Sequence, residues 1–167
     1  MPLTIYLTSS CNLNCKYCFS YEDRKSKLSL AEIDNILCCA SDIGVKNLTI
    51  TGGEPFIHHE ILQALDIAYN KGFWINILTN GLLINDEMME ELTKYQWKLS
   101  FRVSMDGGTK DKHEYFRGKG TFSKAIQVIN KLIKNNMRVG IGFTAYEENI
   151  NEIENIVRLC IDLKCDF

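Results

Sequence analysis

The sequence predicts an α/β fold, in which about five βα units form an open, partial (β/α) TIM-like barrel. Short segments with apolar residues at alternate positions recur along the chain, and helical patterns separate them. Strands separated by helical patterns of this length run parallel, with right-handed crossovers. A closed (β/α)₈ barrel has more units than this chain supplies, so we expect an open or incomplete one.

The predicted elements follow one another without an obvious boundary. The strands lie at residues 3–8, 47–51, 73–78, 99–104 and 138–144. The first helix starts with the capping-box spacing of Ser29 and Glu32 and ends before Gly44. Later helices lie near residues 59–71, 86–95, 121–136 and 151–163. Residues 107–120 are the longest irregular stretch, and we expect a functional loop there.

Composition limits the classes of protein to consider. The 167 residues are 46% hydrophobic, enough for one core and one domain. The net charge of −2 favours neither a nucleic-acid partner nor an acidic membrane surface. No apolar run reaches the roughly 18 residues of a spanning helix, and residues 1–20 lack a signal-peptide profile. We therefore expect a cytoplasmic protein.

Three of the seven cysteines, Cys11, Cys15 and Cys18, are grouped in the loop that follows the first strand. A compact set of three thiolates leaves one iron of a cubane cluster without a protein ligand. Zinc is an alternative, because a fourth ligand could come from elsewhere in the chain. The candidates for that ligand are His58, His59 and Cys38. Dithiol redox chemistry is a third hypothesis, since Cys15 and Cys18 form a CxxC pair.

The CxxxCxxC run, with Tyr17 before its last cysteine, resembles the hallmark of the radical S-adenosylmethionine (SAM) superfamily. Residues 51–55, Thr-Gly-Gly-Glu-Pro, resemble the GGEP motif of the same superfamily and follow the second strand. The likeness extends through Thr-Asn-Gly at 79–81 and Ser-Met-Asp-Gly at 104–107. It continues through Arg-Gly-Lys-Gly-Thr-Phe at 117–122, and so covers essentially the whole chain.

The resemblance implies one [4Fe–4S] cluster held by Cys11, Cys15 and Cys18, with SAM bound to the open iron. It implies reductive cleavage of SAM to a 5′-deoxyadenosyl radical that abstracts hydrogen from a substrate. Gly52, Gly53 and Glu54 would hold the methionine amino group, and glycine would let the backbone approach a ligand closely.

The resemblance also gives roles to three residues outside these two motifs. Tyr17 would lie by the adenine, Ser104 would meet the ribose, and Arg117 would pair with the SAM carboxylate. Asn80 and Thr144 are weaker candidates at the ends of strands. Asp106 is interpreted as the cap of the turn into Gly107 and Gly108.

Residues 104–122 look like the subgroup whose members carry a C-terminal SPASM domain and modify peptides or proteins. We therefore expect a peptide or protein substrate and an electron donor such as flavodoxin or ferredoxin. Residues 1–167 would be a radical SAM core domain that is incomplete at its C-terminus, without the SPASM domain or the sixth strand. The expected edge strand at 138–144 would then be unprotected. A core-only activating enzyme and a non-catalytic zinc- or cluster-binding module are the alternatives.

Overall fold

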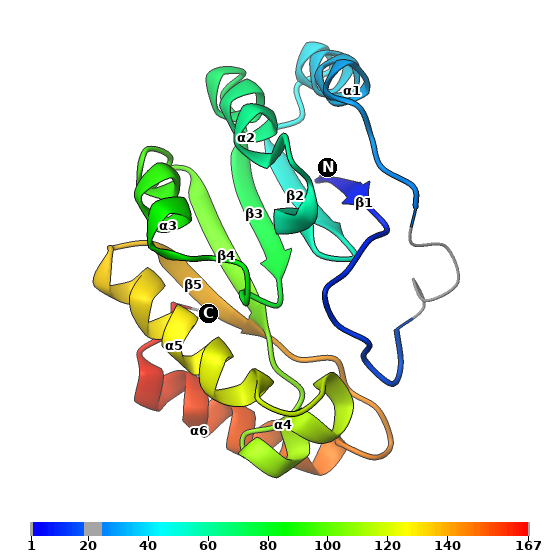
Figure 1. Ribbon diagram of the computed structural model, residues 1–167. Helices are drawn as coiled ribbons and strands as arrows, with labels where there is room; N and C mark the ends of the chain where they lie inside the picture. The colour runs from blue at the N-terminus through cyan, green and yellow to red at the C-terminus, as the bar shows by residue number, and fades with distance from the viewer. Residues whose placement is uncertain (1, 19–24, 167) are drawn as a thin grey trace.

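The computed structural model describes residues 2–18 and 25–166, and within them the chain forms one five-stranded parallel sheet of order β1-β2-β3-β4-β5 (Figure 1). The strands are β1 (Leu3–Thr8), β2 (Asn47–Gly52), β3 (Trp74–Thr79), β4 (Leu99–Ser104) and β5 (Arg138–Gly142). Each pairs in parallel with the next along the chain. The predicted fold class is confirmed: the sheet is open and helices connect its strands.

The helices that connect the strands cover one face of the sheet (Figure 1). They are α1 (Leu30–Asp42), α2 (Ile61–Asn70), α3 (Asp86–Thr93), α4 (Lys110–Arg117) and α5 (Thr121–Lys134), with a short 3₁₀ turn η2 (Pro55–Ile57). A second 3₁₀ turn, η3 (Ile150–Glu152), and α6 (Ile153–Leu163) follow the last strand. Side chains of Ile50, Ile77 and Phe101 are fully buried beneath this layer. None of the described helices is long and apolar enough to cross a bilayer.

Alternation along the strands gives the sheet two different faces. In β4, Leu99, Phe101 and Val103 are buried, whereas Ser100, Arg102 and Ser104 are partly or fully exposed. Successive side chains in a strand point to opposite faces, so these polar residues lie on the face away from the buried core. We call it the inner face, because an open barrel curves around it.

Residues 107–120, which were expected to be irregular, contain a helix, α4, so the expected irregularity was wrong. Only His113 and Phe116 of this helix are buried. Two buried positions one turn apart, among charged residues, give too short an apolar stripe to be recognised as a helix.

Element boundaries also differ slightly from those predicted. The capping box of Ser29 and Glu32 is present at the start of α1, as predicted. The last strand ends at Gly142. The outer edge of β5 makes two hydrogen bonds to Asp166 near the start of the strand. The Asp166 N–H donates to the Val139 carbonyl at 2.8 Å, and the Val139 N–H donates to the Asp166 carboxylate at 2.8 Å. Phe167, where a sixth strand was expected to begin, lies outside the described residues.

Candidate functional site

Both sequence motifs meet at the carboxyl end of the sheet, where they line one cavity of about 240 Å³. Parallel strands bring their C-terminal ends to the same edge, so loops far apart in the sequence become neighbours there. The cavity is lined by Cys11, Leu13, Cys15, Tyr17, Cys18, Thr51, Gly52, Gly53, Leu78, Thr79, Asn80, Ser104, Arg117, Thr144 and Tyr146. Every predicted site residue except Glu54 is among them.

Two glycines let the turn after β2 lie directly against the cysteine loop. The Gly53 N–H donates to the Thr8 carbonyl at 2.7 Å, and the Glu54 N–H donates to the Ser10 carbonyl at 2.8 Å. A Cβ on Gly53 would lie 2.2 Å from the Ser10 carbonyl oxygen, and Gly52 has a φ of +143°. Glycine is required at both positions, because a side chain would displace the segment that leads into Cys11.

Glu54 points into the protein rather than into the cavity. It is 1% exposed, and its carboxylate accepts hydrogen bonds from the Thr79 hydroxyl (2.7 Å), the Asn80 N–H (2.8 Å) and the Phe56 N–H (3.2 Å). Burial raises the pKa of Glu54, while these bonds act in the opposite direction. Its carboxylate thus ties the turn after β2 to the end of β3. A contact with SAM stays a prediction.

The cysteine loop is fixed to the rest of the site by a buried network of charge and hydrogen bonds. Asp106 is 0% exposed and forms an ion pair with Arg117, whose side chain is 10% exposed. The Tyr17 hydroxyl donates to the Asp106 carboxylate, and the Arg117 Nη2 donates to the Tyr17 hydroxyl at 2.6 Å. Asp106 is therefore the counterion of Arg117 and an anchor for the loop, which corrects its reading as a turn cap.

Further bonds connect this network to α4 and to the loop after β5. The Lys16 N–H donates to the Phe116 carbonyl at 3.0 Å. Asn149, which is fully buried, donates through its amide to the Asp106 carbonyl (3.2 Å) and the Thr144 carbonyl (3.0 Å). Sequence reasoning missed Asn149, because an isolated asparagine in a loop carries no local signal.

Tyr146 is a second residue that the sequence did not reveal. Its ring lies 4.6 Å from that of Tyr17, centroid to centroid, and it lines the cavity. Phe116 contacts Tyr17 on another side, at 6.0 Å. Tyr17 is thus held by aromatic neighbours as well as by its hydroxyl, and this limits where a ligand can pack against its ring.

The donor set of the cavity fits an iron–sulfur cluster with one open iron. Among the described residues, its lining includes three thiols and no histidine or carboxylate side chain. Burial raises the pKa of the Cys15 thiol, and the nearby Arg117 guanidinium works against that rise. Iron–sulfur clusters take thiolate ligands, whereas a structural zinc site usually takes four protein ligands.

The residues considered as a fourth zinc ligand lie elsewhere. The ligand atoms of His58, His59 and Glu60 lie within 4.8 Å of one another. Both ring nitrogens of His58 are nevertheless engaged, since Nε2 lies 2.7 Å from the Leu28 carbonyl and Nδ1 accepts from the Glu60 N–H at 3.3 Å. Cys38 lies 2.9 Å from the Lys71 ammonium, between α1 and α2.

The chain matches the radical SAM superfamily over residues 5–160. It belongs to that superfamily. Enzymes of this family use a [4Fe–4S] cluster and SAM. The location of the three cysteines and of the turn after β2 at one cavity agrees with this membership.

Similar proteins include the antilisterial bacteriocin subtilosin biosynthesis protein AlbA of Bacillus subtilis strain 168, which is 32% identical over 98% of this chain and 38% of its own length. The sporulation killing factor maturation protein SkfB of the same strain is 30% identical over 94% of this chain and 38% of its own length. A GTP 3′,8-cyclase of Alkaliphilus oremlandii strain OhILAs is 30% identical over 98% of this chain and 53% of its own length. The chain thus spans about two fifths to about half the length of these relatives.

Among solved structures, that of Streptococcus suis SuiB bound to SAM superposes with a TM-score of 0.87. The identity is 23%, over 99% of this chain and 39% of SuiB. This radical SAM core therefore shares its fold with SuiB.

Changing Gly53 to alanine is expected to remove cluster binding. The added Cβ forces Ser10 away, and Ser10 precedes Cys11 in the chain. The expected result is loss of visible cluster absorption after anaerobic reconstitution. The control is Gly44→Ala at the end of α1, where the φ of +79° strains an alanine but the added Cβ meets nothing within 4 Å, so this variant is expected to lose some stability and to keep its cluster. Full cluster content in Gly53→Ala would contradict the steric argument.

Replacing Asp106 by asparagine is expected to lower the free energy of unfolding by about 3 to 5 kcal/mol, because it leaves a buried guanidinium without its counterion. The matched control is Asp86→Asn, which breaks an ion pair between Lys131 and an Asp86 side chain that is 94% exposed. That change is expected to cost less than about 1 kcal/mol. Denaturant unfolding of both variants measures the difference. An equal loss of unfolding free energy in the two variants would contradict the anchoring role of Asp106.

Stability is expected to fall with acid through His113, which is 1% exposed and whose Nδ1 accepts from the Asp106 N–H at 3.4 Å. Burial lowers the pKa of His113 from 6.5 to about 4. As the pH falls from 6.5 toward 4, His113 becomes protonated in the unfolded chain but stays neutral in the folded protein. The free energy of unfolding therefore decreases. Between about pH 7.5 and about pH 5.5 the loss is about 1 kcal/mol. Denaturant unfolding of the wild type and of His113→Asn measures it, and the same pH dependence in both would refute it.

Proposed function

We propose that this chain is the core domain of a radical SAM enzyme that modifies a peptide or protein, with residues 1–167 forming the part that binds the cluster and SAM. The observation that supports it most is the meeting of three cysteines and the Gly-Gly-Glu-Pro turn at one cavity. Cys11, Cys15 and Cys18 are the cluster ligands in this proposal. When bound, the cluster would supply the electron for reductive cleavage of a C–S bond of SAM, which yields methionine and the 5′-deoxyadenosyl radical.

The residues of the chain bind and orient SAM and exclude water around it. The backbone of Gly52 and Gly53 borders the cavity and offers main-chain groups to the methionine end of SAM. Ser104 lines the cavity from the end of β4 and is placed to bind a ribose hydroxyl. Glu54 supports the same turn from behind, through Thr79 and Asn80.

Arg117 has two roles in this proposal. Its bonds to Asp106 and Tyr17 hold the cysteine loop, and its positive charge at the cavity attracts the SAM carboxylate. Tyr17 presents its ring to the adenine. Because Asp106 and Tyr146 restrain Tyr17, the ring is already oriented before SAM binds.

The peptide or protein substrate is supported by the names of the relatives. AlbA is a bacteriocin biosynthesis protein, SkfB is a maturation protein, and SuiB has been solved with the precursor peptide SuiA. An electron donor such as flavodoxin or ferredoxin completes the reaction we propose. A SPASM domain with auxiliary clusters would accompany this core in a peptide-modifying enzyme of that subgroup, whereas an activating enzyme would lack it.

The ligand assignment predicts that alanine at Cys11, Cys15 or Cys18 abolishes the visible absorption of the cluster and the EPR signal of its reduced form. Each variant is reconstituted anaerobically with iron and sulfide, reduced with dithionite and assayed for 5′-deoxyadenosine. Cys38→Ala and Cys160→Ala are the matched controls, because neither residue lines the cavity. A full cluster in Cys15→Ala would overturn the assignment. Stoichiometric zinc, with no 5′-deoxyadenosine from the wild type, would favour the non-catalytic module.

A further inference from the structure

Arg102 lies on the inner face of the sheet, one step below the proposed SAM site. It precedes Ser104 by two residues on β4, so both side chains are on the same face. Its neighbours in the adjoining strands are Leu78 on β3 and Gly140 on β5. An exposed arginine on β4, a strand that is paired on both sides, has a fixed backbone position from which to contact a ligand.

Glycines on β5 make room for this arginine and set its direction. Opposite Arg102 is Gly140, and Gly142 lies opposite Ser104. A Cβ on Gly142 would lie 3.0 Å from the Arg102 Cγ and 3.3 Å from its Cδ. The aliphatic stem of Arg102 therefore passes over Gly142, toward the end of the sheet that carries the cysteines.

A second cavity, of about 410 Å³, joins Arg102 to the cysteine cavity. It is lined by Leu78, Arg102, Ser104, Ile141, Gly142, Phe143 and Thr144. Three of these residues, Leu78, Ser104 and Thr144, also line the cysteine cavity. A ligand group held by Arg102 would thus be adjacent to a ligand of the cysteine cavity.

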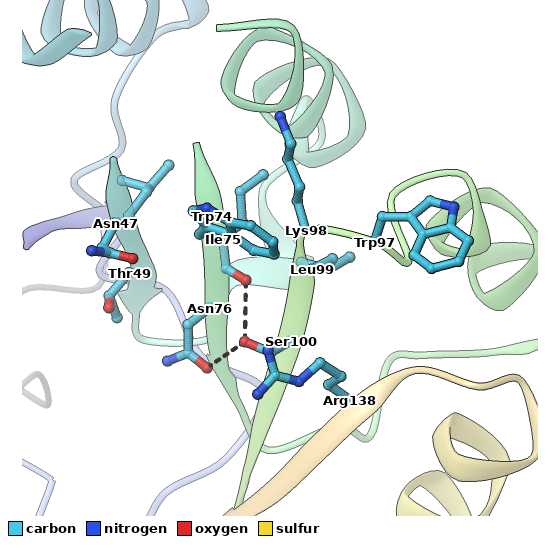
Figure 2. A pocket seen from close by; sticks show the side chains of 11 residues that line it. Asn47, Thr49, Trp74, Ile75, Asn76, Trp97, Lys98, Leu99, Ser100 and Arg138 are labelled. Atoms are coloured by element: carbon cyan, nitrogen blue, oxygen red, sulfur yellow. Dashed lines mark hydrogen bonds between the residues drawn. The ribbon is translucent and has the colours of Figure 1, made fainter. Parts of the chain in front are cut away.

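Positive charge continues down the inner face. A further cavity of about 230 Å³ at the other end of the sheet includes Arg138, which is paired with Ser100. Figure 2 shows the Arg138 side chain on the side of the sheet that carries Asn76 and Ser100, whose hydroxyl donates to the Asn76 amide oxygen at 3.3 Å. The described residues that line the three cavities include the cations Lys98, Arg102, Arg117 and Arg138, of which Arg117 is paired with Asp106 behind the cavity, and no aspartate or glutamate.

We propose that Arg102 is a substrate-binding residue that pairs with a carboxylate of the peptide, an acidic side chain close to the residue that is modified. The inference rests on the proposed peptide-modifying function and adds the chemistry of the substrate segment. A guanidinium binds a carboxylate through two parallel hydrogen bonds, which fixes orientation as well as position. Arg138 adds charge further along the same face and favours an acidic over a neutral segment.

The test measures binding rather than turnover. The reconstituted protein, with its cluster oxidised and SAM present, is titrated into two probe peptides, Ac-Gly-Gly-Glu-Gly-Gly-NH₂ and its Gln counterpart. Binding is measured from the relaxation of the peptides' own NMR signals. The Glu peptide is expected to bind about tenfold more tightly than the Gln peptide, a difference of about 1.4 kcal/mol. Raising the salt concentration is expected to reduce this preference.

Two changes of different kind are expected to affect the preference. Arg102→Gln removes the charge and is expected to abolish it, whereas Gly142→Ala keeps the charge, crowds the arginine stem and is expected to reduce it. The matched control is Arg158→Gln on α6, where the arginine pairs with Glu154 at 2.6 Å. It is expected to bind both peptides as the wild type does. Cluster absorption shows whether each variant is folded, and the wild-type comparison of the two peptides holds even if a variant is not.

Three results would overturn the proposal. Equal binding of the Glu and Gln peptides by the wild type is the first. The second is an equal loss of SAM binding and peptide binding in Arg102→Gln, which would assign the arginine to SAM. Tighter, Arg102-dependent binding of GTP than of the Glu peptide is the third, and it would assign the face to a nucleotide. A failure of SAM cleavage by the wild type would count against the proposed function alone, since binding is measured without turnover.

Discussion

The shape of the site depends on one buried charge, the carboxylate of Asp106. A carboxylate removed from water needs a counterion and hydrogen-bond donors, and here Arg117 and Tyr17 supply them. Arg117 comes from the end of α4 and Tyr17 from the cysteine loop, so neutralising this charge brings both segments to the end of β4. The backbone of Asp106 is held as well, by His113 and Asn149. The electrostatic requirement of one residue therefore sets the positions of several loops.

A steric requirement acts on the other side of the cavity. The turn after β2 touches the segment between β1 and Cys11 so closely that only glycine fits at positions 52 and 53. Glu54 then fastens the same turn to the end of β3. The cysteine loop is thus restrained by charge on one side and by backbone contact on the other. Such restraint prepares the site in advance, so that cofactor binding costs less ordering entropy.

The two faces of the sheet have different roles: one forms the core, and the other borders the cavities. One face is apolar, and the connecting helices cover it. The inner face carries Ser100, Arg102 and Ser104, and the cavities lie along it from the cysteines toward Arg138. Ligands of α/β folds bind at the carboxyl ends of parallel strands, and the cysteine cavity follows that rule. A polar inner face next to that end offers a substrate a path to the same site.

The sequence by itself determined the parallel α/β order, the single core and the motifs at the ends of strands, because these depend on the periodicity and spacing of nearby residues. It also supplied the cysteines, and the tertiary structure brought them to one cavity with Gly53 and Ser104. Only the tertiary structure showed α4, the inward direction of Glu54, the pairing of Asp106 with Tyr17 and the course of Arg102 over Gly142. Tyr17 and Asp106 are 89 positions apart, and Glu54 and Thr79 are 25 apart. Contacts over such separations arise from how the strands and helices pack, which local sequence patterns do not encode.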